Sequence, residues 1–197
     1  MDADGIELQI FPLTTERWTD LETLFGPKGA FAGCWCMWWR LPRKQFYAQQ
    51  GEGNRLAFRA IVEKGEIPGI LAYAGSEPVG WCAVAPRANY PGLARSKNLK
   101  PIDDQPVWSI TCFYVRKKDR KKGVMRALIE GAAAFVRSQG GTIIEAYPFL
   151  PKETRSPDPS VYMGLLPAFQ AAGFSIVNQS SERQVIVRKD LTFAVTG

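Results

Sequence analysis

A run of basic residues that ends at a glycine is the feature of this sequence with the clearest chemical meaning. Six of the seven residues 116–122 are Lys or Arg, and Gly123 follows directly. The run lies between an apolar segment, 107–115, and a segment, 124–136, whose apolar residues recur at three- and four-residue spacing. The first N–H groups of a helix have no internal partner and, together with the helix dipole, attract anions. We therefore expect a phosphate-binding site around residues 120–125.

The flanking segments predict the elements that would hold this loop. Residues 107–115 are rich in β-branched and aromatic side chains, as is typical of a buried central strand. Further strands are predicted at 6–13, 70–74, 79–85, 142–149, 174–179 and 183–191, and further helices from Thr15, from a cap at Asn54 and over 161–174. This pattern indicates an α/β protein, and a length of 197 residues favours one domain spanning 1–197.

Composition limits the classes of function. The charge of +6 favours anionic partners, which include phosphorylated cofactors, nucleic acids and membrane surfaces. The sequence contains no histidine, so any proton transfer uses carboxylates, tyrosine, cysteine or water. No apolar run approaches the roughly 20 residues that cross a bilayer, and the acidic start differs from a signal peptide. We therefore predict a cytoplasmic protein without a membrane partner.

The basic loop matches neither common nucleotide-binding pattern. The sequence GxxxxGK[ST] is absent, and no GxGxxG follows the predicted strand, which disfavours ATP and NAD. Residues 120–125, RKKGVM, instead resemble the pyrophosphate loop of the GNAT superfamily of acyl-CoA-dependent N-acyltransferases, roughly [RQ]xxGx[GA] after a strand that ends in valine. The segment AFQAAGF at 168–174 is similar to the late helix of that family, and the order of predicted elements extends the resemblance over nearly the whole chain.

The resemblance implies a fold, a reaction and a cosubstrate. The fold is a mixed, mostly antiparallel central sheet of six to seven strands flanked by helices. The reaction is transfer of an acetyl group from acetyl-CoA, or another acyl group from its CoA thioester, to a primary amine of a small molecule or peptide by direct attack, without a metal. A homodimer is compatible with the family.

The resemblance also assigns the cofactor-binding residues. The pyrophosphate would lie on the loop and the start of the helix, and the pantetheine arm along the end of the strand. The residues implied are Phe113, Tyr114, Val115, Arg120, Lys121, Lys122, Gly123, Val124 and Met125. Two positions depart from the family pattern, because Met125 stands where glycine or alanine is usual and Phe169 stands where many members have a tyrosine that protonates the leaving thiolate.

Several residues are candidates for proton transfer. Glu145 is a carboxylate in an otherwise apolar predicted strand, so it is a general base, the partner of a nearby arginine or a side chain that faces outwards. Asp103 and Asp104 are alternative bases, although a solvated turn is the better explanation for them. Tyr147 and Tyr162 are the candidate acids in place of Phe169. A thiol with a pKa near 8.5 is also a tolerable leaving group without an enzymic acid.

The aromatic segment CWCMWW at 34–39 fits neither helix nor strand spacing. In the family this region borders the acceptor site, so Trp35, Trp38 and Trp39 are candidate substrate-binding residues that would wall an apolar or cationic substrate. The alternative is that they anchor the core or a loop. Two cysteines without a second pair or any histidine cannot complete a tetrahedral metal site, so we predict no metal. We expect Cys112 to be a buried, inert thiol for lack of an activating histidine.

Two other classes of function remain open at this point. A catalytically silent acyl-CoA sensor on the same fold is compatible with the phenylalanine at position 169. A nucleic-acid-binding protein is compatible with the net charge, but such proteins usually spread their basic residues over a face, whereas here the charge is concentrated at the start of one helix.

Overall fold

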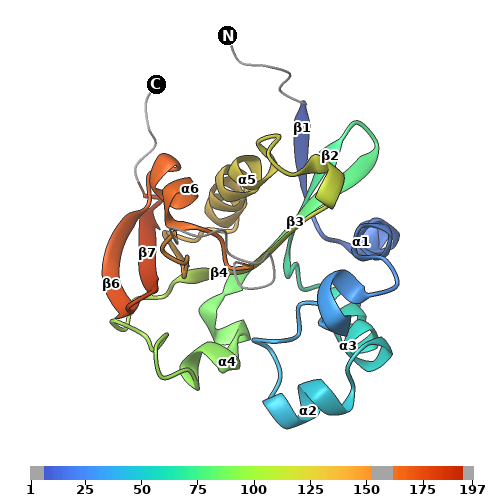
Figure 1. Cartoon of the computed structure of the whole chain (residues 1–197), viewed down its shortest axis with the longest axis horizontal. Helices are drawn as coiled ribbons and strands as arrows, with labels where there is room; N and C mark the ends of the chain where they lie inside the picture. Colours follow the sequence, from blue (N-terminus) through green and yellow to red (C-terminus); the bar gives the residue numbers. More distant parts are fainter. Residues whose placement is uncertain (1–6, 152–161, 193–197) are drawn as a thin grey trace.

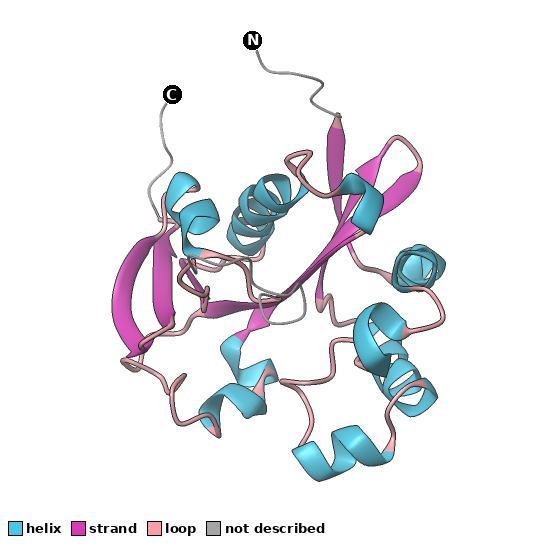
Figure 2. Cartoon of the chain, viewed as in Figure 1, coloured by secondary structure: helices cyan, strands magenta, loops and turns pink. Residues whose placement is uncertain are grey.

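Strands from both ends of the chain meet in a single sheet. The computed structural model describes residues 7–151 and 162–192, and its seven strands lie in the order β1-β2-β3-β4-β5-β7-β6. The strands are β1 (Leu8–Pro12), β2 (Gly69–Ala74), β3 (Glu77–Pro86), β4 (Trp108–Val115), β5 (Ile143–Ala146), β6 (Ser175–Ser181) and β7 (Gln184–Asp190). Of these neighbours only β4 and β5 are parallel, which confirms the predicted mixed, mostly antiparallel α/β sheet flanked by helices (Figures 1 and 2).

Helices cover both faces of this sheet. The helices are α1 (Trp18–Phe25), α2 (Arg43–Ala48), α3 (Glu52–Glu63), α4 (Pro91–Ala94), α5 (Val124–Ser138) and α6 (Leu166–Ala171). On β2, Ile70 packs in the cluster that contains α5, whereas its neighbour Leu71 packs in the cluster that contains α1 and α3. Successive side chains of a strand point to opposite faces, so burial on both faces explains why the central strands are almost continuously apolar.

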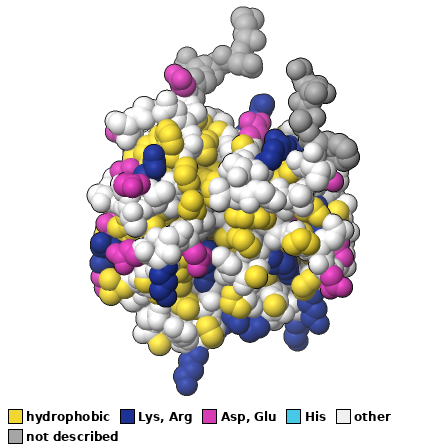
Figure 3. Space-filling view, turned by 180° about the vertical axis from the view of Figure 1, so that it is seen from behind, with side chains coloured by type: hydrophobic (Ala, Val, Ile, Leu, Met, Phe, Trp, Pro, Cys, Tyr) yellow, Lys and Arg dark blue, Asp and Glu magenta, His cyan; other side chains and the backbone are white. Residues whose placement is uncertain are grey.

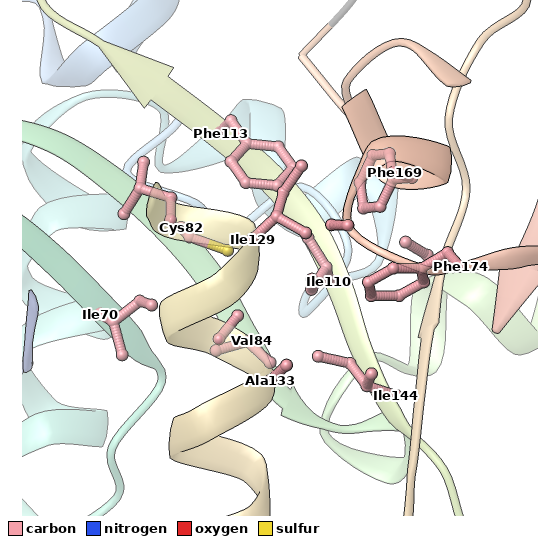
Figure 4. Packing of buried hydrophobic residues seen from close by; sticks show 14 of the residues in the cluster. Ile70, Cys82, Val84, Ile110, Phe113, Ile129, Ala133, Ile144, Phe169 and Phe174 are labelled. Carbon is pink, nitrogen blue, oxygen red and sulfur yellow. The ribbon is translucent and has the colours of Figure 1, made fainter. Parts of the chain in front are cut away.

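Close packing fixes α5 against the sheet. A Cβ atom added to Gly80 would lie 2.6 Å from Val124, and one added to Gly131 would lie 2.8 Å from Ile10. Only glycine therefore allows the helix to approach β3 and β1 this closely. Figure 4 shows the apolar side chains that fill this layer, including Ile129 on α5 and Phe113 on β4. The first turn of α5 is thus held beside the end of β4.

The parallel strands β4 and β5 separate towards their carboxyl ends. Their pairing runs from Trp108 opposite Ile144 to Ile110 opposite Ala146 and continues no further among the described residues. Beyond this point, the N–H of Phe113 donates to the carbonyl oxygen of Tyr162 at 2.7 Å. A different segment therefore occupies the wedge between the two strands, and the last part of β4 presents an open edge.

Three sequence-based boundaries were wrong. Asn54 does not cap a helix, because α3 begins at Glu52 and the Asn54 amide instead donates to the carbonyl oxygens of Gly33 and Phe46. Helix α6 begins at Leu166, so Tyr162 precedes it instead of starting it. Strand β5 ends at Ala146, three residues before the predicted end at 149. Residues 152–161 of the predicted loop and helix lie outside the described residues.

Candidate active site

One cavity of about 690 Å³ joins the basic loop to the aromatic segment. It begins at the loop 119–121 and the first turn of α5, follows the end of β4, and reaches the residues between α1 and α2. This volume lies within the range of small-molecule and cofactor sites. All of the predicted cofactor-binding residues except Lys122 line it, as do Trp38, Trp39 and Tyr162. The sequence-based candidates from three distant segments therefore lie around the same space.

The basic loop has the backbone geometry of an anion cradle. Lys121 and Gly123 both have positive φ angles, +65° and +80°, and α5 starts at the next residue. A Cβ atom added to Gly123 would meet no atom within 4 Å, so the space beside this glycine is open. Left-handed residues directly before a helix turn successive N–H groups towards one concavity. The residues present therefore fit the pyrophosphate of a CoA thioester.

One buried acidic residue, Asp119, holds the basic loop in place. The buried carboxylate of Asp119 accepts hydrogen bonds from Arg116 and from Lys122, the latter at 3.5 Å. Burial alone would raise the pKa of Asp119, but these two cations outweigh it and hold the pKa below its usual value. The carboxylate is therefore charged at neutral pH and pairs with Arg116 and Lys122.

The remaining cations of the loop differ in their partners. Lys118 pairs with Glu77 at 3.5 Å on the side of β3. Arg120 and Lys121 line the cavity, and Arg120 Nε also donates to the carbonyl oxygen of Val115 at 3.2 Å. The loop therefore directs part of its positive charge into the cavity and neutralises part of it within the protein.

Tyr162 is the candidate acid that the structure brings to the cavity. Burial chiefly, and the nearby Cys112 thiol next, raise the pKa of its phenol above the usual value, although Arg43 and the indoles of Trp38 and Trp39 act in the opposite direction. The phenol is therefore protonated at neutral pH and can donate a proton. Its backbone carbonyl accepts a hydrogen bond from the N–H of Phe113 at 2.7 Å.

Glu145 and Tyr147 lie elsewhere, in a buried polar network behind β4. Glu145 is 1% exposed and accepts from Arg87 at 2.7 Å and from Arg188 at 2.8 Å. The Tyr147 hydroxyl donates to Glu145 at 2.6 Å and lies 2.7 Å from the Ser109 hydroxyl. Neither residue lines the cavity. This geometry matches the alternative interpretation of Glu145, a carboxylate paired with arginine, and it does not bring Glu145 or Tyr147 to the substrates.

The other carboxylate candidates are also distant from the cavity. Asp103 forms a bidentate pair with Arg188, with N···O distances of 2.6 and 3.0 Å, and so extends the Glu145 network to the surface. Asp104 is exposed and lines no part of the cavity. Among the residues that the structure describes, Asp119 is the sole carboxylate on the cavity wall, and its cation partners occupy it.

The three tryptophans of the aromatic segment have different positions. Trp38 and Trp39 line the cavity, but Trp35 is buried between Trp18 and Phe25 at ring distances of 6.2 and 5.5 Å. The structure therefore places Trp35 in the core, the alternative considered from the sequence. Phe169 is also a core residue, packed against Phe113 at 5.9 Å and outside the cavity wall.

Two aromatic residues of α2 on the cavity wall had not been identified from the sequence. Phe46 and Tyr47 lie against Trp38, with ring centroids 5.2 and 6.2 Å away. Arg43, one turn earlier, lies 3.0 Å above the Trp38 ring and donates to its carbonyl oxygen. The segment RKQFYA carries two adjacent aromatics in a short polar helix, which is the one local signal that could have indicated them.

Thiols gather at one side of the cavity without forming a metal site. Cys34, Cys36 and Cys112 line the wall, and Cys36 accepts a hydrogen bond from the Trp81 indole at 3.0 Å. The Cys112 thiol and burial raise the pKa of Cys36 well above its usual value, so Cys36 is a poor nucleophile. No group of three or more Cys, Asp and Glu residues in the described segments is arranged to hold a metal ion.

Comparison with known proteins agrees with this geometry. Residues 35–156 match the model of the acetyltransferase (GNAT) family. An N-acetyltransferase from Staphylococcus aureus is similar in structure, with a TM-score of 0.55 and 12% identity over 94% of this chain and 99% of that one. A PaiA N-acetyltransferase from Thermoplasma acidophilum in complex with coenzyme A is similar with a TM-score of 0.51 and 12% identity over 93% and 99%. No curated protein sequence gives a significant match.

The sheet with its separated parallel pair and the loop at the start of α5 define an acyl-CoA-dependent acyltransferase. Because the family model spans more than half of the sequence, the chain belongs to the acetyltransferase (GNAT) family. The family uses acetyl-CoA as cosubstrate, and the predicted resemblance is confirmed. In the described part of the chain, no helix is both long enough and apolar enough to cross a membrane.

Proposed function

We propose that this protein transfers the acetyl group of acetyl-CoA to a primary amine of a small molecule or peptide by direct attack. The observation that carries the proposal is the continuity of the cavity from the Gly123 loop, along β4, to Tyr162 and the aromatic wall. A cavity that joins an anion cradle to a proton donor can hold both substrates side by side. Positioning two substrates in this way accounts for much of the rate acceleration in a direct transfer.

Each part of the wall has an assigned role. Arg120, Lys121 and the N–H groups at Gly123 would bind the pyrophosphate. The edge of β4 would bind the pantetheine arm through the carbonyl oxygen of Phe113 and the N–H of Val115, which strand alternation turns towards that edge. The N–H of Phe113 is already bonded to the carbonyl oxygen of Tyr162. Tyr162 replaces the tyrosine that is absent at position 169.

The chemical step follows from these positions. The neutral amine attacks the thioester carbonyl carbon, a C–N bond forms, and the C–S bond breaks. The CoA thiolate leaves with the proton of Tyr162, and the amine releases its proton to water, because no unpaired carboxylate lies on the described cavity wall. The phenol then regains a proton from solvent, so the net products are the acetylated amine and free CoA.

Thermal unfolding with and without ligand tests the cofactor part of the proposal. At 100 times the Kd, a ligand adds about 2.7 kcal/mol, so CoA and acetyl-CoA should raise Tm by about 5–10 °C for a protein of this size. ATP and NAD should cause a much smaller shift. A shift with short DNA in place of CoA would contradict the proposal and favour nucleic-acid binding. CoA binding without thiol release for any amine would instead identify a sensor.

Gly123→Val tests the loop itself. The valine would have to keep the φ of +80° that glycine has here. Its side chain would project into the open space beside the loop. We expect the Kd for CoA, measured by calorimetry, to rise at least about tenfold, since 1.4 kcal/mol corresponds to that factor.

Gly140→Val is the matched control for this substitution. Gly140 follows the other end of α5, has a φ of +79° and also has no atom within 4 Å of an added Cβ. The backbone strain is therefore similar in the two variants, but only Gly123 lines the cavity. Equal losses of CoA affinity in both variants would show that strain, and not the site, is responsible.

A further inference from the structure

The part of the cavity away from the basic loop is walled by aromatic rings. We call the space bounded by Phe31, Trp38, Trp39, Phe46 and Tyr47 the aromatic chamber. Phe31 and Tyr47 are each 59% exposed, although they are large hydrophobic residues. Exposed aromatic residues at the edge of a cavity usually mark a surface that a ligand covers.

Charge is divided unequally along the cavity. The charged residues on its described wall, Asp119, Arg120, Lys121 and Arg126, all belong to the basic loop and the first turn of α5. None of the described residues that wall the chamber is charged. Arg43 lies against the outside of the chamber over Trp38, and its positive charge extends to the phenol of Tyr162. The chamber therefore has a cation at its rim and no carboxylate on its described wall.

This distribution discriminates among amine acceptors. Polyamines, aminoglycosides and lysine-rich peptides carry ammonium groups beyond the one that reacts. Each extra ammonium would lose its hydration in the chamber, and attraction to the ring faces would offset only part of this cost, because the described wall offers no carboxylate partner. It would also approach Arg43, a like charge. A single amine on an apolar body avoids both penalties and buries its own surface against the rings.

The apolar wall also favours the neutral, nucleophilic form of the amine. Desolvation lowers the pKa of an ammonium group, because burial disfavours the charged form. An amine inside the chamber therefore loses its proton more easily than in water and becomes the neutral species that attacks. This effect reduces the need for a general base, in agreement with the displaced position of Glu145.

The chamber is built on a constrained segment. Ala30, Ala32 and Cys36 line the cavity and have positive φ angles of 68°, 47° and 55°, which side chains rarely adopt. The buried amide of Asn54 ties this segment to α2 through the carbonyl oxygens of Gly33 and Phe46. Strained backbone held in place by surrounding contacts is typical of ligand sites. The chamber is therefore preformed and selects by shape as well as by charge.

From these observations we infer that the acceptor is a monoamine with an aromatic or bulky apolar body, bound in the aromatic chamber. This inference rests on the proposed acetyl transfer, and it assigns the class of acceptor within that reaction.

The first experiment compares acceptors by release of CoA thiol from acetyl-CoA. The panel is 2-phenylethylamine and tryptamine against spermidine, kanamycin and a lysine-containing peptide. We expect kcat/KM for the aromatic monoamines to exceed that for each polycation at least about tenfold, which corresponds to 1.4 kcal/mol. A polycation that reacts faster, or no reaction with either aromatic amine, would overturn the inference. CoA binding is measured separately by the rise in Tm. If the inference on the acceptor fails and this rise is still seen, the proposed cofactor site is unaffected.

Variants test the chamber directly. Trp38→Ala should raise the KM for 2-phenylethylamine about tenfold and change the KM for acetyl-CoA little. Arg43→Glu should shift the ratio of kcat/KM for spermidine over 2-phenylethylamine upwards about tenfold, because it reverses the charge at the rim. Leu56→Ala, at an exposed site of α3 outside the cavity wall, is the control and should change neither value. An unchanged amine KM in Trp38→Ala, or an unchanged ratio in Arg43→Glu, would contradict the inference.

Discussion

Tyr162→Phe is expected to lower kcat about a hundredfold at pH 7 and to change the KM for acetyl-CoA less than about threefold. The substitution removes only the phenolic oxygen, so the ring still lines the cavity and the backbone carbonyl still holds the N–H of Phe113. The proton donor for the leaving thiolate is lost, and this loss affects the transition state more than the bound substrate. Steady-state release of CoA thiol at saturating amine measures the effect.

The pH dependence should identify the role of the phenol. Burial holds the pKa of Tyr162 above its usual value of 10, so the donor stays protonated through neutral and mildly alkaline pH. A thiol has a pKa near 8.5, so the released sulfur ends as a protonated thiol below that pH and as a thiolate above it, and a donated proton matters less as the pH rises. The difference in kcat between the wild type and Tyr162→Phe should therefore narrow from pH 7 to pH 10. A constant difference would indicate a structural role for the hydroxyl.

Tyr147→Phe is the matched control for this prediction. Tyr147 is the other candidate acid from the sequence, but its hydroxyl is bonded to Glu145 and Ser109 and lies outside the cavity wall. Its removal should cost about 1–2 kcal/mol of stability and leave kcat nearly unchanged. If kcat falls in Tyr147→Phe and not in Tyr162→Phe, the assignment of the acid is wrong.

The cofactor end of the site was predictable because its parts are consecutive in the chain. A strand, a basic loop and a helix start within about 20 residues, and each has its own local signal in composition or spacing. The acetyl-CoA cosubstrate, the mixed sheet and the family could therefore be inferred from the sequence, and the structure and the family match agree with them.

The interior pairings were not predictable from local pattern. Glu145 finds Arg87 58 residues earlier and Arg188 43 residues later, and no periodicity links those positions. Trp35 and Trp38 are three residues apart in the same motif, yet one enters the core and the other the cavity. The positive φ angles of Trp35 and Cys36 break the regular spacing between them. In such a segment, tertiary contacts decide which side chains enter the core and which line the cavity, and the sequence does not display those contacts.

The distribution of charge on the surface bears on nucleic-acid binding. Figure 3 shows one face of the molecule, on which basic side chains lie among acidic and apolar ones. The basic loop itself is partly neutralised by Asp119 and Glu77. A cradle at one helix start suits a compact pyrophosphate better than a long polyanion, which needs charge along an extended surface.

Glu145→Gln is expected to destabilise the fold strongly and to leave kcat nearly unchanged. The carboxylate lies between two guanidinium groups and is almost fully buried, so the amide would leave two cations with less compensation. Removing one partner of a buried ion pair costs about 3–5 kcal/mol, and 3 kcal/mol corresponds to a fall in Tm of about 6–12 °C for a chain of this size. Thermal unfolding of purified protein measures this fall, and kcat should be assayed well below the lowered Tm.

The opposite result would restore Glu145 as the general base. In that case the variant would keep its Tm and lose kcat by two orders of magnitude or more, since a base acts in the transition state. Asp103→Asn provides the comparison within the same network, because Asp103 pairs with Arg188 nearer the surface, where solvent screens an ion pair and it contributes little to stability. A large loss of stability for Glu145→Gln, a small one for Asp103→Asn and near-normal kcat in both would establish that the network holds β5 against β7 and takes no part in the transfer.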